Sequence, residues 1–350
     1  MKTALVMAGG TGGHVFPGLA VADELRAAGW DVVWMGARTG MEARLVPPRG
    51  YRMAWIRATA LRGKGVLAAL LLPLNLLIGF GQAAAAILRL RPDVVLGLGG
   101  YVAFPGGMMA SLLARPLAVH EQNAIAGLAN RVLARLADRA MTAFPDVLPG
   151  AEWTGNPVRS DIAALPAPEA RFAGREGPLR LLVVGGSLGA QALNDCVPRA
   201  LALLAARPSV VHQSGEKHLD ALRARYREAG VEGELVSFID DMARRYAEAD
   251  LVVCRAGAIT VAELSAGGVA SVLVPFPHAV DDHQSANARF LSDAGAAILL
   301  PQSELTPQRL ADTLRALDRP RLLEMARKAR ALGKPEAART VARRCMELAA

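Results

Sequence analysis

Two glycine-rich turns, each directly after a short apolar run, constrain this chain more than any other feature. Residues 7–14 read MAGGTGGH after the run 3–6, and residues 185–191 read GGSLGAQ after the run 181–184. A strand, a glycine-rich turn and a helix together direct backbone N–H groups at the helix N-terminus, which is a ready anion site. Because the turns lie half a chain apart, the sequence predicts two similar domains facing one cleft. Only the first turn carries a histidine, so we expect the two halves to have different functions.

Apolar runs alternate with amphipathic stretches along the chain, which predicts a doubly wound α/β fold in each half. The runs are near-continuous, as expected for parallel strands that are covered on both faces. Helices are expected between them, for example over residues 16–28 and 191–206. The expected strands are residues 3–8, 31–36, 93–97, 117–120, 139–143, 180–184, 209–213, 234–238, 250–254, 271–274 and 297–300.

A length of 350 residues favours two domains over one. We place the boundary near the GNPVR sequence at 155–159, so that the domains cover residues 1–157 and 158–335. Residues 163–178 are rich in Ala, Pro and Gly and are expected to form a linker or an irregular entry. A final helix is expected over 336–348, and the pattern allows it to pack on either domain.

Composition narrows the class of protein. The three cysteines are far apart and odd in number, so we expect no disulfide framework and a reducing cytoplasm. No basic-then-apolar leader precedes the first strand, so we expect no signal peptide. The net charge of +8 has two interpretations: attraction to an acidic surface or substrate, or a compositional bias toward arginine.

One segment, residues 66–88, contains no charged side chain. It is long enough to span a bilayer, but Pro73, Asn75 and several small residues weaken that interpretation. Two others stay open: a buried crossover helix, and an exposed apolar helix that rests on a membrane. The flanking cations suit contacts with anionic lipid; they are Arg62, Lys64, Arg89 and Arg91.

The first turn is an imperfect dinucleotide fingerprint, because Val15 stands where G-x-G-x-x-G needs its third glycine. Arg38 follows the second strand instead of an acid, so an NADP site is weakened but stays open. His14 is more specific. It falls at the start of a helix, where the dipole favours the neutral imidazole. We therefore expect either a general base facing a cleft or a structural histidine bonded to the loop.

The second turn places Ser187 and neighbouring N–H groups where a diphosphate can bind. Residues 185–189 also match the G-x-S-x-G elbow of serine hydrolases. The partners that such a nucleophile needs follow later in the chain, so this alternative stays open; the candidate histidines are His212, His218, His278 and His283.

Two further segments follow predicted strands, at the edge where ligands of such folds bind. Residues 254–263 read CRAGAITVAE and end in Glu263, either a ribose ligand or a helix N-terminal acid. Residues 275–287 form a polar loop suited to sugar hydroxyls. Its cluster of Asp281, Asp282 and His283 is too compact for a complete metal site, and we expect no metal.

Eight strings, in order from residue 9 to 284, resemble the GT-B glycosyltransferases that form lipid II in peptidoglycan synthesis by transferring GlcNAc from UDP-GlcNAc. The strings are GGTGGHVFPGLAVA, LRGKG, PDVVLGLGGYVAFPG, HEQNAIAGLANR, GNPVR, VVGGSLGAQ, FIDDM and CRAGAITVAE. The resemblance implies a GT-B fold, two Rossmann-like doubly wound parallel-sheet domains with the active site in the cleft between them. It assigns the lipid-linked acceptor to the first domain and UDP-GlcNAc to the second. It also returns the last helix, within 336–350, to the first domain.

The resemblance implies substrate contacts residue by residue. It assigns Ser187 to the diphosphate, Ile239 to the uracil, Glu263 to the ribose hydroxyls and Gln284 to the GlcNAc hydroxyls. Loop lengths differ among relatives, so His283 competes with Gln284 for the sugar. The other implied contacts with the UDP-GlcNAc donor are Thr11, Gly12, Gly13, Asn123, Arg159, Ala258, Ile259, Thr260, Val261 and Ala262.

The implied reaction is an inverting displacement in which the acceptor 4-hydroxyl of the MurNAc-pentapeptide attacks the anomeric carbon. We expect His14 to take the hydroxyl proton; Glu121 is the alternative base, and His14 would then orient the acceptor diphosphate. No cofactor is expected. Backbone N–H groups and an arginine would stabilise the leaving UDP.

The acceptor's polyprenyl tail stays in the bilayer, so the resemblance favours a peripheral protein on the cytoplasmic face of the anionic inner membrane. We expect Leu76, Leu77 and Phe80 to contact the membrane. Other cell-wall synthesis proteins are expected partners, and nucleic acid is not. The alternatives are a UDP-GlcNAc epimerase, against which HEQN, LRGKG and the apolar segment speak, and a non-catalytic sugar-nucleotide-binding protein.

Overall fold

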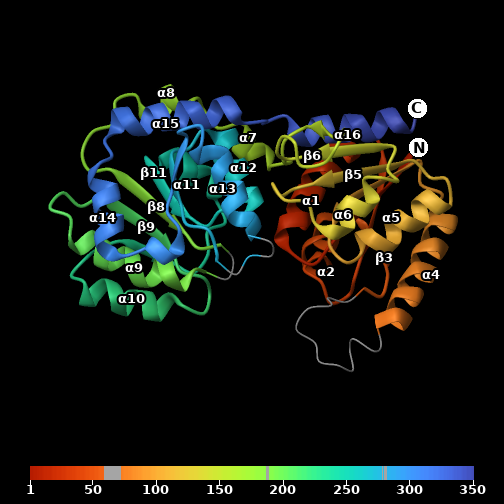
Figure 1. The fold of residues 1–350 in the computed structure, drawn as a ribbon, viewed down its shortest axis with the longest axis horizontal. Helices are drawn as coiled ribbons and strands as arrows, with labels where there is room; N and C mark the ends of the chain where they lie inside the picture. The colour runs from red at the N-terminus through yellow and green to blue at the C-terminus, as the bar shows by residue number, and fades with distance from the viewer. Residues whose placement is uncertain (59–71, 187–188, 278, 280–281) are drawn as a thin grey trace. The chain divides into compact units, whose positions relative to one another are not determined.

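The computed structural model describes residues 1–58, 72–186, 189–277, 279 and 282–350 (Figure 1). It forms two compact units. The first unit comprises Met1–Arg159 with Glu336–Ala350, and the second comprises Ser160–Pro335. The predicted residues Arg62, Lys64, Ser187, His278 and Asp281 lie outside the described residues.

The first unit is built on a seven-stranded parallel sheet of order β3-β2-β1-β4-β5-β6-β7. The order reverses between β1 and β4, and ligands of open α/β sheets bind outside the carboxyl ends of strands at such a point. The first glycine-rich turn lies there, directly after β1. The strands are β1 Thr3–Ala8, β2 Asp31–Gly36, β3 Arg52–Trp55, β4 Val94–Gly99, β5 Leu117–Glu121, β6 Arg139–Thr142 and β7 Glu152–Trp153.

Helices cover both faces of this sheet. One buried apolar cluster joins it to α1 and α16, which pack against each other, and a second joins it to α4 and α5. The strands are buried on both sides because their sequences are near-continuous apolar runs. The helices are α1 Gly12–Ala27, α2 Glu42–Leu45, α4 Leu72–Leu90, α5 Ala103–Leu112, α6 Leu128–Leu133 and α16 Ala337–Leu348, with a 3₁₀ turn at Pro47–Arg49.

The second unit has a six-stranded parallel sheet of order β10-β9-β8-β11-β12-β13, again reversing direction, here between β8 and β11. The strands are β8 Arg180–Val184, β9 Ser209–Gln213, β10 Glu234–Val236, β11 Leu251–Cys254, β12 Ser271–Leu273 and β13 Ala297–Leu299. The helices are α7 Ser160–Ala163, α8 Pro168–Phe172, α9 Gln191–Ala202, α10 Leu219–Glu228, α11 Met242–Glu248, α12 Ala258–Gly267, α13 His283–Ser292, α14 Pro307–Arg315 and α15 Arg319–Leu332, with a 3₁₀ turn at Gln302–Glu304.

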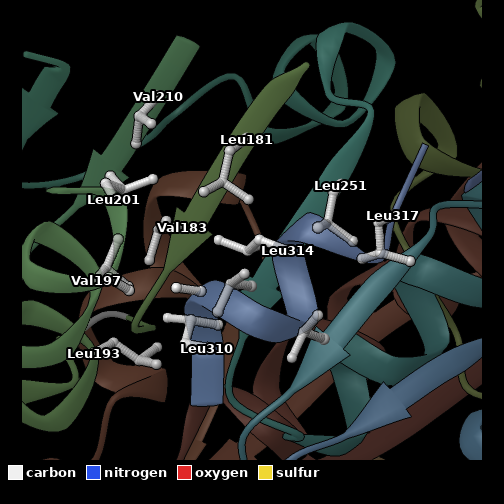
Figure 2. Close-up of a cluster of buried hydrophobic side chains, with 14 of the residues drawn as sticks. Leu181, Val183, Leu193, Val197, Leu201, Val210, Leu251, Leu310, Leu314 and Leu317 are labelled. Carbon is white, nitrogen blue, oxygen red and sulfur yellow. The ribbon is translucent and has the colours of Figure 1, made fainter. Parts of the chain in front are cut away.

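The core of the second unit forms where α9 and α14 meet one face of the sheet (Figure 2). Leu181 and Val183 of β8 point toward Val197 of α9 and Leu314 of α14 in this view. Alternate residues of β8 face this side, as the two-residue period of a strand requires.

All eleven predicted strands are present: four keep the predicted bounds, five are shortened by one or two residues, and the other two extend further at the carboxyl end. Two strands were not predicted. Residues 52–55 form the edge strand β3, which has only four residues and begins with the exposed Arg52, and β7 has only two residues. The prediction of an irregular 163–178 is wrong in part, because α8 lies inside it.

The segment predicted over 66–88 contains α4, the one helix in the described part of the chain that is long and apolar enough to cross a membrane. Ala83 and Ile87 are buried in the core of the first unit. Only 22% of the window Pro73–Leu90 is buried, so α4 crosses over between β3 and β4 but is not the buried core helix that one interpretation expected.

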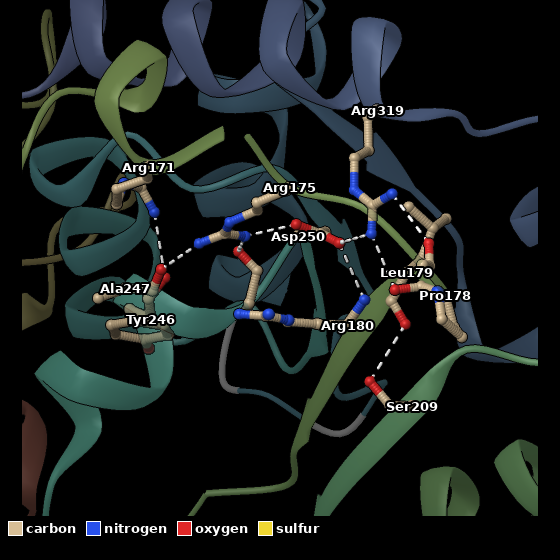
Figure 3. Close-up of polar contacts among 12 residues, drawn as sticks. Arg171, Arg175, Pro178, Leu179, Arg180, Ser209, Tyr246, Ala247, Asp250 and Arg319 are labelled. Atoms are coloured by element: carbon tan, nitrogen blue, oxygen red, sulfur yellow. Dashed lines mark hydrogen bonds and ion pairs between the residues drawn. The ribbon is translucent and has the colours of Figure 1, made fainter. Parts of the chain in front are cut away.

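A buried carboxylate, Asp250, organises the edge of the second sheet at which the strands begin (Figure 3). It is ion-paired with Arg175, accepts a 3.0 Å hydrogen bond from the backbone N–H of Arg180, and lies 3.3 Å from Nη2 of Arg319. Its side chain is fully buried, so these partners replace water completely. Asp250 therefore connects β8, β11 and α15.

Arg171 of α8 lies in the same region and has no carboxylate as a hydrogen-bond partner among the described residues. Its guanidinium donates to the carbonyl oxygens of Pro166, Tyr246 and Gly267 at 3.0–3.2 Å. Burial, reinforced by the neighbouring arginines, lowers the pKa of Arg171 to about 10. These bonds hold α8 against α11 and the end of α12, so this Ala/Pro/Gly-rich segment is ordered.

We predict that Asp250→Ala destabilises the second unit by about 3–5 kcal/mol, because it leaves buried arginine without its carboxylate. The measurement is urea unfolding followed by circular dichroism. Asp220→Ala is the matched control, since its pair with Arg223 is exposed; its midpoint should stay near wild type. If Asp250→Ala lowered the free energy of unfolding by less than about 1 kcal/mol, Asp250 would not be a stabilising buried partner of the arginines.

Candidate functional site

The first glycine-rich turn brings His14 to the N-terminus of α1. Gly10 has a positive φ of 87°, and Thr11 is the extended N-cap residue that precedes Gly12, the first helical residue. His14 is therefore the third residue of α1, where the helix dipole favours an uncharged ring. Its Nδ1 lies 3.3 Å from the Thr11 hydroxyl oxygen. The ring is thus oriented by the turn that precedes it.

The end of β4 is shaped to accept this ring. A Cβ on Gly99 would lie 3.0 Å from both Cδ2 and Nε2 of His14, and a Cβ on Gly100 would lie 2.2 Å from the carbonyl oxygen of Gly9. Both glycines have positive φ, 107° and 80°. The absence of side chains at these two positions lets the first turn pack against the end of β4.

Glu121, the alternative base, ends β5 and is 2% exposed. Its Oε1 accepts from the backbone N–H of Asn123 at 2.9 Å, and from the amide of that side chain at 3.3 Å. Its Oε2 accepts from the N–H of Gly127 at 3.1 Å and from Nδ2 of Asn130 at 2.9 Å. Four donors therefore hold the carboxylate, which orders the loop that follows β5.

His120 precedes it and is fully buried. Its Nε2 donates to the carbonyl oxygen of Gly155 at 2.9 Å, so Nδ1 is the acceptor for Gln122 Nε2 at 3.0 Å. Burial lowers the pKa of His120 to about 4. His120 is a neutral link between β5 and the segment after β7. Asn130 lies beside the end of β4, because its Nδ2 is 3.4 Å from the Cβ position of Gly99.

The second glycine-rich turn is held by the end of β9. Gly189 donates its N–H to the carbonyl oxygen of Gly186 at 2.8 Å, and Gln213 Nε2 donates to the same oxygen at 2.9 Å. A Cβ on Gly189 would lie 1.9 Å from the carbonyl oxygen of Ser214. The turn therefore packs directly on the backbone of the neighbouring strand end.

A chain of hydrogen bonds from side chains of α9 and α10 supports this strand end. Asn194 donates Nδ2 to the Ser214 carbonyl at 3.1 Å, so its Oδ1 faces Nε2 of His212 at 3.1 Å. Nε2 therefore carries the proton, and Nδ1 accepts from the Tyr226 hydroxyl at 3.0 Å. Burial lowers the pKa of His212 to about 3. With both ring nitrogens bonded, His212 is not the partner of a serine nucleophile.

The segment after β11 presents backbone donors. Ala258 begins α12, and the N–H of Val261 already donates to the carbonyl of Gly257 at 2.9 Å. In a helix the N–H groups before that bond have no intrahelical acceptor. The donors available to an anion are therefore those of Ala258, Ile259 and Thr260. Val261 is fully buried, so its side chain contacts the core.

Glu263 is the sixth residue of α12, so its interpretation as a helix N-terminal acid is wrong. Its Oε2 accepts from the Tyr246 hydroxyl at 3.1 Å. Ile239 is buried before α11. Gln284 lies in the first turn of α13, and its Oε1 accepts from the N–H of Phe276 at 2.9 Å. His283 is the first residue of the same helix.

The structure thus brings His14, Thr11, Gly12 and Gly13 together in the first unit, with Asn123 at the loop after β5. In the second unit, Ala258 to Glu263 form one segment on α12, while Ile239 and Gln284 follow other strands. Arg159 ends the first unit. Among the described residues, no group of three His, Cys, Asp or Glu side chains is placed to hold a metal ion.

Comparisons with known proteins cover the whole chain. Residues 4–142 match the glycosyltransferase family 28 N-terminal domain, and residues 180–341 match the C-terminal domain of that family. A protein of Aromatoleum aromaticum is 68% identical over 100% of this chain and 99% of its own length. One of Azoarcus sp. is 67% identical over the same shares. Both are named UDP-N-acetylglucosamine–N-acetylmuramyl-(pentapeptide) pyrophosphoryl-undecaprenol N-acetylglucosamine transferase.

A solved structure also supports membership of this family. The crystal structure of Acinetobacter baumannii MurG has a TM-score of 0.88 and 42% identity, and it covers 99% of this chain and 100% of that one. A UDP-GlcNAc 2-epimerase from Neisseria meningitidis has a TM-score of 0.68 over 99% and 100% of the two chains. At 13% identity, this second likeness shows the fold alone.

We predict that acid destabilises both units through their buried histidines. The folded-state pKa values of about 4 for His120 and about 3 for His212 lie below the ordinary 6.5, so stability present above pH 6.5 is lost as the pH falls toward those values. Each histidine lowers the free energy of unfolding by about 2 kcal/mol when the pH falls from 7 to 5. Urea unfolding at pH 7 and pH 5 measures the free energy of unfolding that is lost over this interval. In His212→Asn this loss should be about 2 kcal/mol smaller than in the wild type. His218→Gln, outside the network, should keep the wild-type loss; an unchanged loss in His212→Asn would contradict the prediction.

Proposed function

The chain belongs to glycosyltransferase family 28, and we propose on that premise that it transfers GlcNAc from UDP-GlcNAc to lipid I, forming lipid II in peptidoglycan synthesis. The observation that carries this function is full-length identity above 60% to transferases of that name. The site described above supplies groups suited to each part of the reaction.

His14 acts as the general base. The 4-hydroxyl oxygen of the acceptor MurNAc forms a bond to the anomeric carbon of GlcNAc, the bond from that carbon to the UDP oxygen breaks, and the hydroxyl proton passes to His14 Nε2. Two contacts support this role. Thr11 orients Nδ1, and the missing side chain at Gly99 leaves room beside Nε2. The start of α1 favours the unprotonated ring that a base requires.

Glu121 is a positioning residue in this proposal. Both of its oxygens accept hydrogen bonds from the loop that contains Asn123 and from Asn130. Proton abstraction would require those bonds to be exchanged for one to the acceptor hydroxyl. Glu121 therefore holds Asn123, an expected substrate contact, in place, and leaves the base role to His14.

The donor binds at the carboxyl edge of the second sheet. The free N–H groups at the start of α12 and the second glycine-rich turn stabilise the diphosphate as negative charge develops on leaving UDP. Glu263, held by Tyr246, accepts from the ribose hydroxyls. Ile239 lies against the uracil. Because Gln284 Oε1 already accepts from Phe276, its amide N–H₂ is the group offered to the GlcNAc hydroxyls.

The exposed face of α4 docks on the membrane surface. Leu74 and Leu77 are 56% and 68% exposed, and Leu88 is exposed on the same helix. Leu76 and Phe80 are only half-buried, and Phe80 packs edge-on against Phe104 of α5 with ring centroids 6.0 Å apart. An apolar face near Arg89 and Arg91 suits a helix lying in the interface of an anionic bilayer. The protein is peripheral on the cytoplasmic face.

We predict that His14→Ala lowers kcat about 10²–10⁴-fold while UDP-GlcNAc still binds, because a base contributes to proton transfer and not to donor affinity. UDP release with a muramyl-diphosphate-lipid acceptor measures the first quantity, and calorimetry measures the second. Gly99→Ala, which crowds the ring without removing it, should also lower kcat. Transfer near the wild-type rate in His14→Ala would assign the base elsewhere.

We predict that Leu74→Glu with Leu77→Glu releases the protein from anionic phospholipid vesicles and leaves turnover of a short-chain soluble acceptor unchanged. Co-sedimentation with vesicles measures binding. Leu203→Glu, at an exposed leucine of the second unit, is the matched control and should bind like wild type. Unchanged binding of the double variant would remove α4 from the membrane contact.

A further inference from the structure

An arginine at the carboxyl edge of the second sheet is bound by neutral oxygens. Arg255 directly follows β11 and is partly buried. Its Nη1 donates to the carbonyl oxygens of Val274 and Pro275 at 3.1 and 3.2 Å, and its Nη2 donates to Oε1 of Gln302 at 2.6 Å. Burial lowers the pKa of Arg255. Within the described part of the chain no carboxylate pairs with this cation, so its position depends on these three oxygens.

The three contacts join the ends of neighbouring strands. In the order β8-β11-β12-β13, Arg255 follows β11, residues 274–275 follow β12, and Gln302 begins the 3₁₀ turn after β13. The guanidinium therefore crosses the end of β12 to reach a side chain beyond it. Because a guanidinium is planar and holds its donors in a fixed fork, acceptors on two different strands restrict its orientation. Of the three acceptors, only Gln302 is a side chain.

Arg255 also holds the loop of residues 274–276, which follows β12. The guanidinium carbon lies 5.4 Å from the centroid of the Phe276 ring, in a cation–π contact. The two carbonyl oxygens that Arg255 binds belong to the two residues before Phe276. The arginine therefore restrains this loop through its backbone and through its aromatic side chain. Phe276 is 41% exposed, so packing in the core holds its ring only in part.

The same loop orients the side chain that meets the sugar. The backbone N–H of Phe276 donates to Oε1 of Gln284 at 2.9 Å. The oxygen and the nitrogen of an amide share one carbon, so a bond that fixes Oε1 also fixes the direction of the N–H₂ group. This N–H₂ group is the one that the proposed function offers to the GlcNAc hydroxyls. A displaced loop would turn it away from the sugar.

We propose that Gln302 is a positioning residue for the donor sugar, acting through Arg255 and the loop 274–276 on the amide of Gln284. Gln302 lies outside all eight strings that resemble the family. The inference rests on the proposed function, from which it takes the contact between Gln284 and GlcNAc. It divides donor recognition into two parts: the sugar depends on Gln302, whereas UDP, bound at α12, does not.

The test is Gln302→Leu, which keeps the approximate size of the side chain but removes the acceptor for Arg255. We expect the Kd for UDP-GlcNAc to rise about 10-fold and the Kd for UDP to change less than about twofold, because only the first ligand carries the sugar. Calorimetry measures both. Gln302→Glu keeps an acceptor oxygen and should keep the wild-type ratio of the two Kd values. Gln308→Leu, at an exposed glutamine of α14, is the matched control and should leave both Kd values unchanged.

A double-mutant cycle tests the path from Gln302 to the sugar. If Gln302 acts through the amide of Gln284, Gln302→Leu has nothing left to displace once that amide is gone. In the Gln284→Ala background, Gln302→Leu should therefore change the Kd for UDP-GlcNAc less than about twofold. Urea unfolding followed by circular dichroism checks that each variant folds. If Gln302→Leu does not fold, Gln302→Ala carries the same expectations.

Three results would overturn the proposal: an unchanged Kd ratio in Gln302→Leu, an equal rise of both Kd values, or the same rise in the wild-type and Gln284→Ala backgrounds. A wild-type Kd ratio in Gln284→Ala alone would reject the sugar contact on which the proposal rests. Failure of the wild type to transfer GlcNAc would instead reject the proposed function. The failures are therefore distinguishable.

Discussion

Backbone N–H and C=O groups lose their ladder partners where parallel strands end, and the rest of this structure depends on how each of them is satisfied. In the first unit, the carboxylate of Glu42 satisfies the turn after β1. In the second unit, the side-chain amide of Gln213 donates to a carbonyl oxygen of the equivalent turn after β8. The same backbone motif therefore bonds to an acceptor in one unit and to a donor in the other.

Three buried carboxylates illustrate how position decides the partner. Glu42 and Glu121 lie at the edge where the strands end, and both accept from backbone N–H groups. Asp250 lies at the edge where the strands begin and is paired with arginines. At the far edge, the pair with Arg319 also joins α15 to the sheet.

Local pattern predicted much of the fold. The long apolar runs were found because a strand covered on both faces needs apolar residues at every position. The strand at 52–55 was missed because it is an edge strand of only four residues, too short to show a strand pattern, and α8 was missed because tertiary contacts of Arg171 hold a segment whose composition indicates a loop. Among the site residues, the glycine-rich turn and helix start predicted the place of His14. Glu42 was not predicted, since no motif distinguishes a lone glutamate in a GMEARL sequence from a solvated one; the glycines at positions 36 and 40 were the available signal.

The sequence by itself determined the two parallel-sheet units, the positions of their glycine-rich turns and the family to which they belong, because these depend on residue order and on short-range backbone preference. Tertiary structure decided which donors and acceptors meet at the strand ends. Glu42 reaches Gly10 across 32 residues, and Asn194 reaches Ser214 across 20. Such contacts depend on how β2 and β9 align with their neighbours, and only the folded sheet sets that alignment. In the sequence, the two turns differ by one histidine. In the structure, the first turn bonds to a buried carboxylate and the second turn bonds to a buried amide.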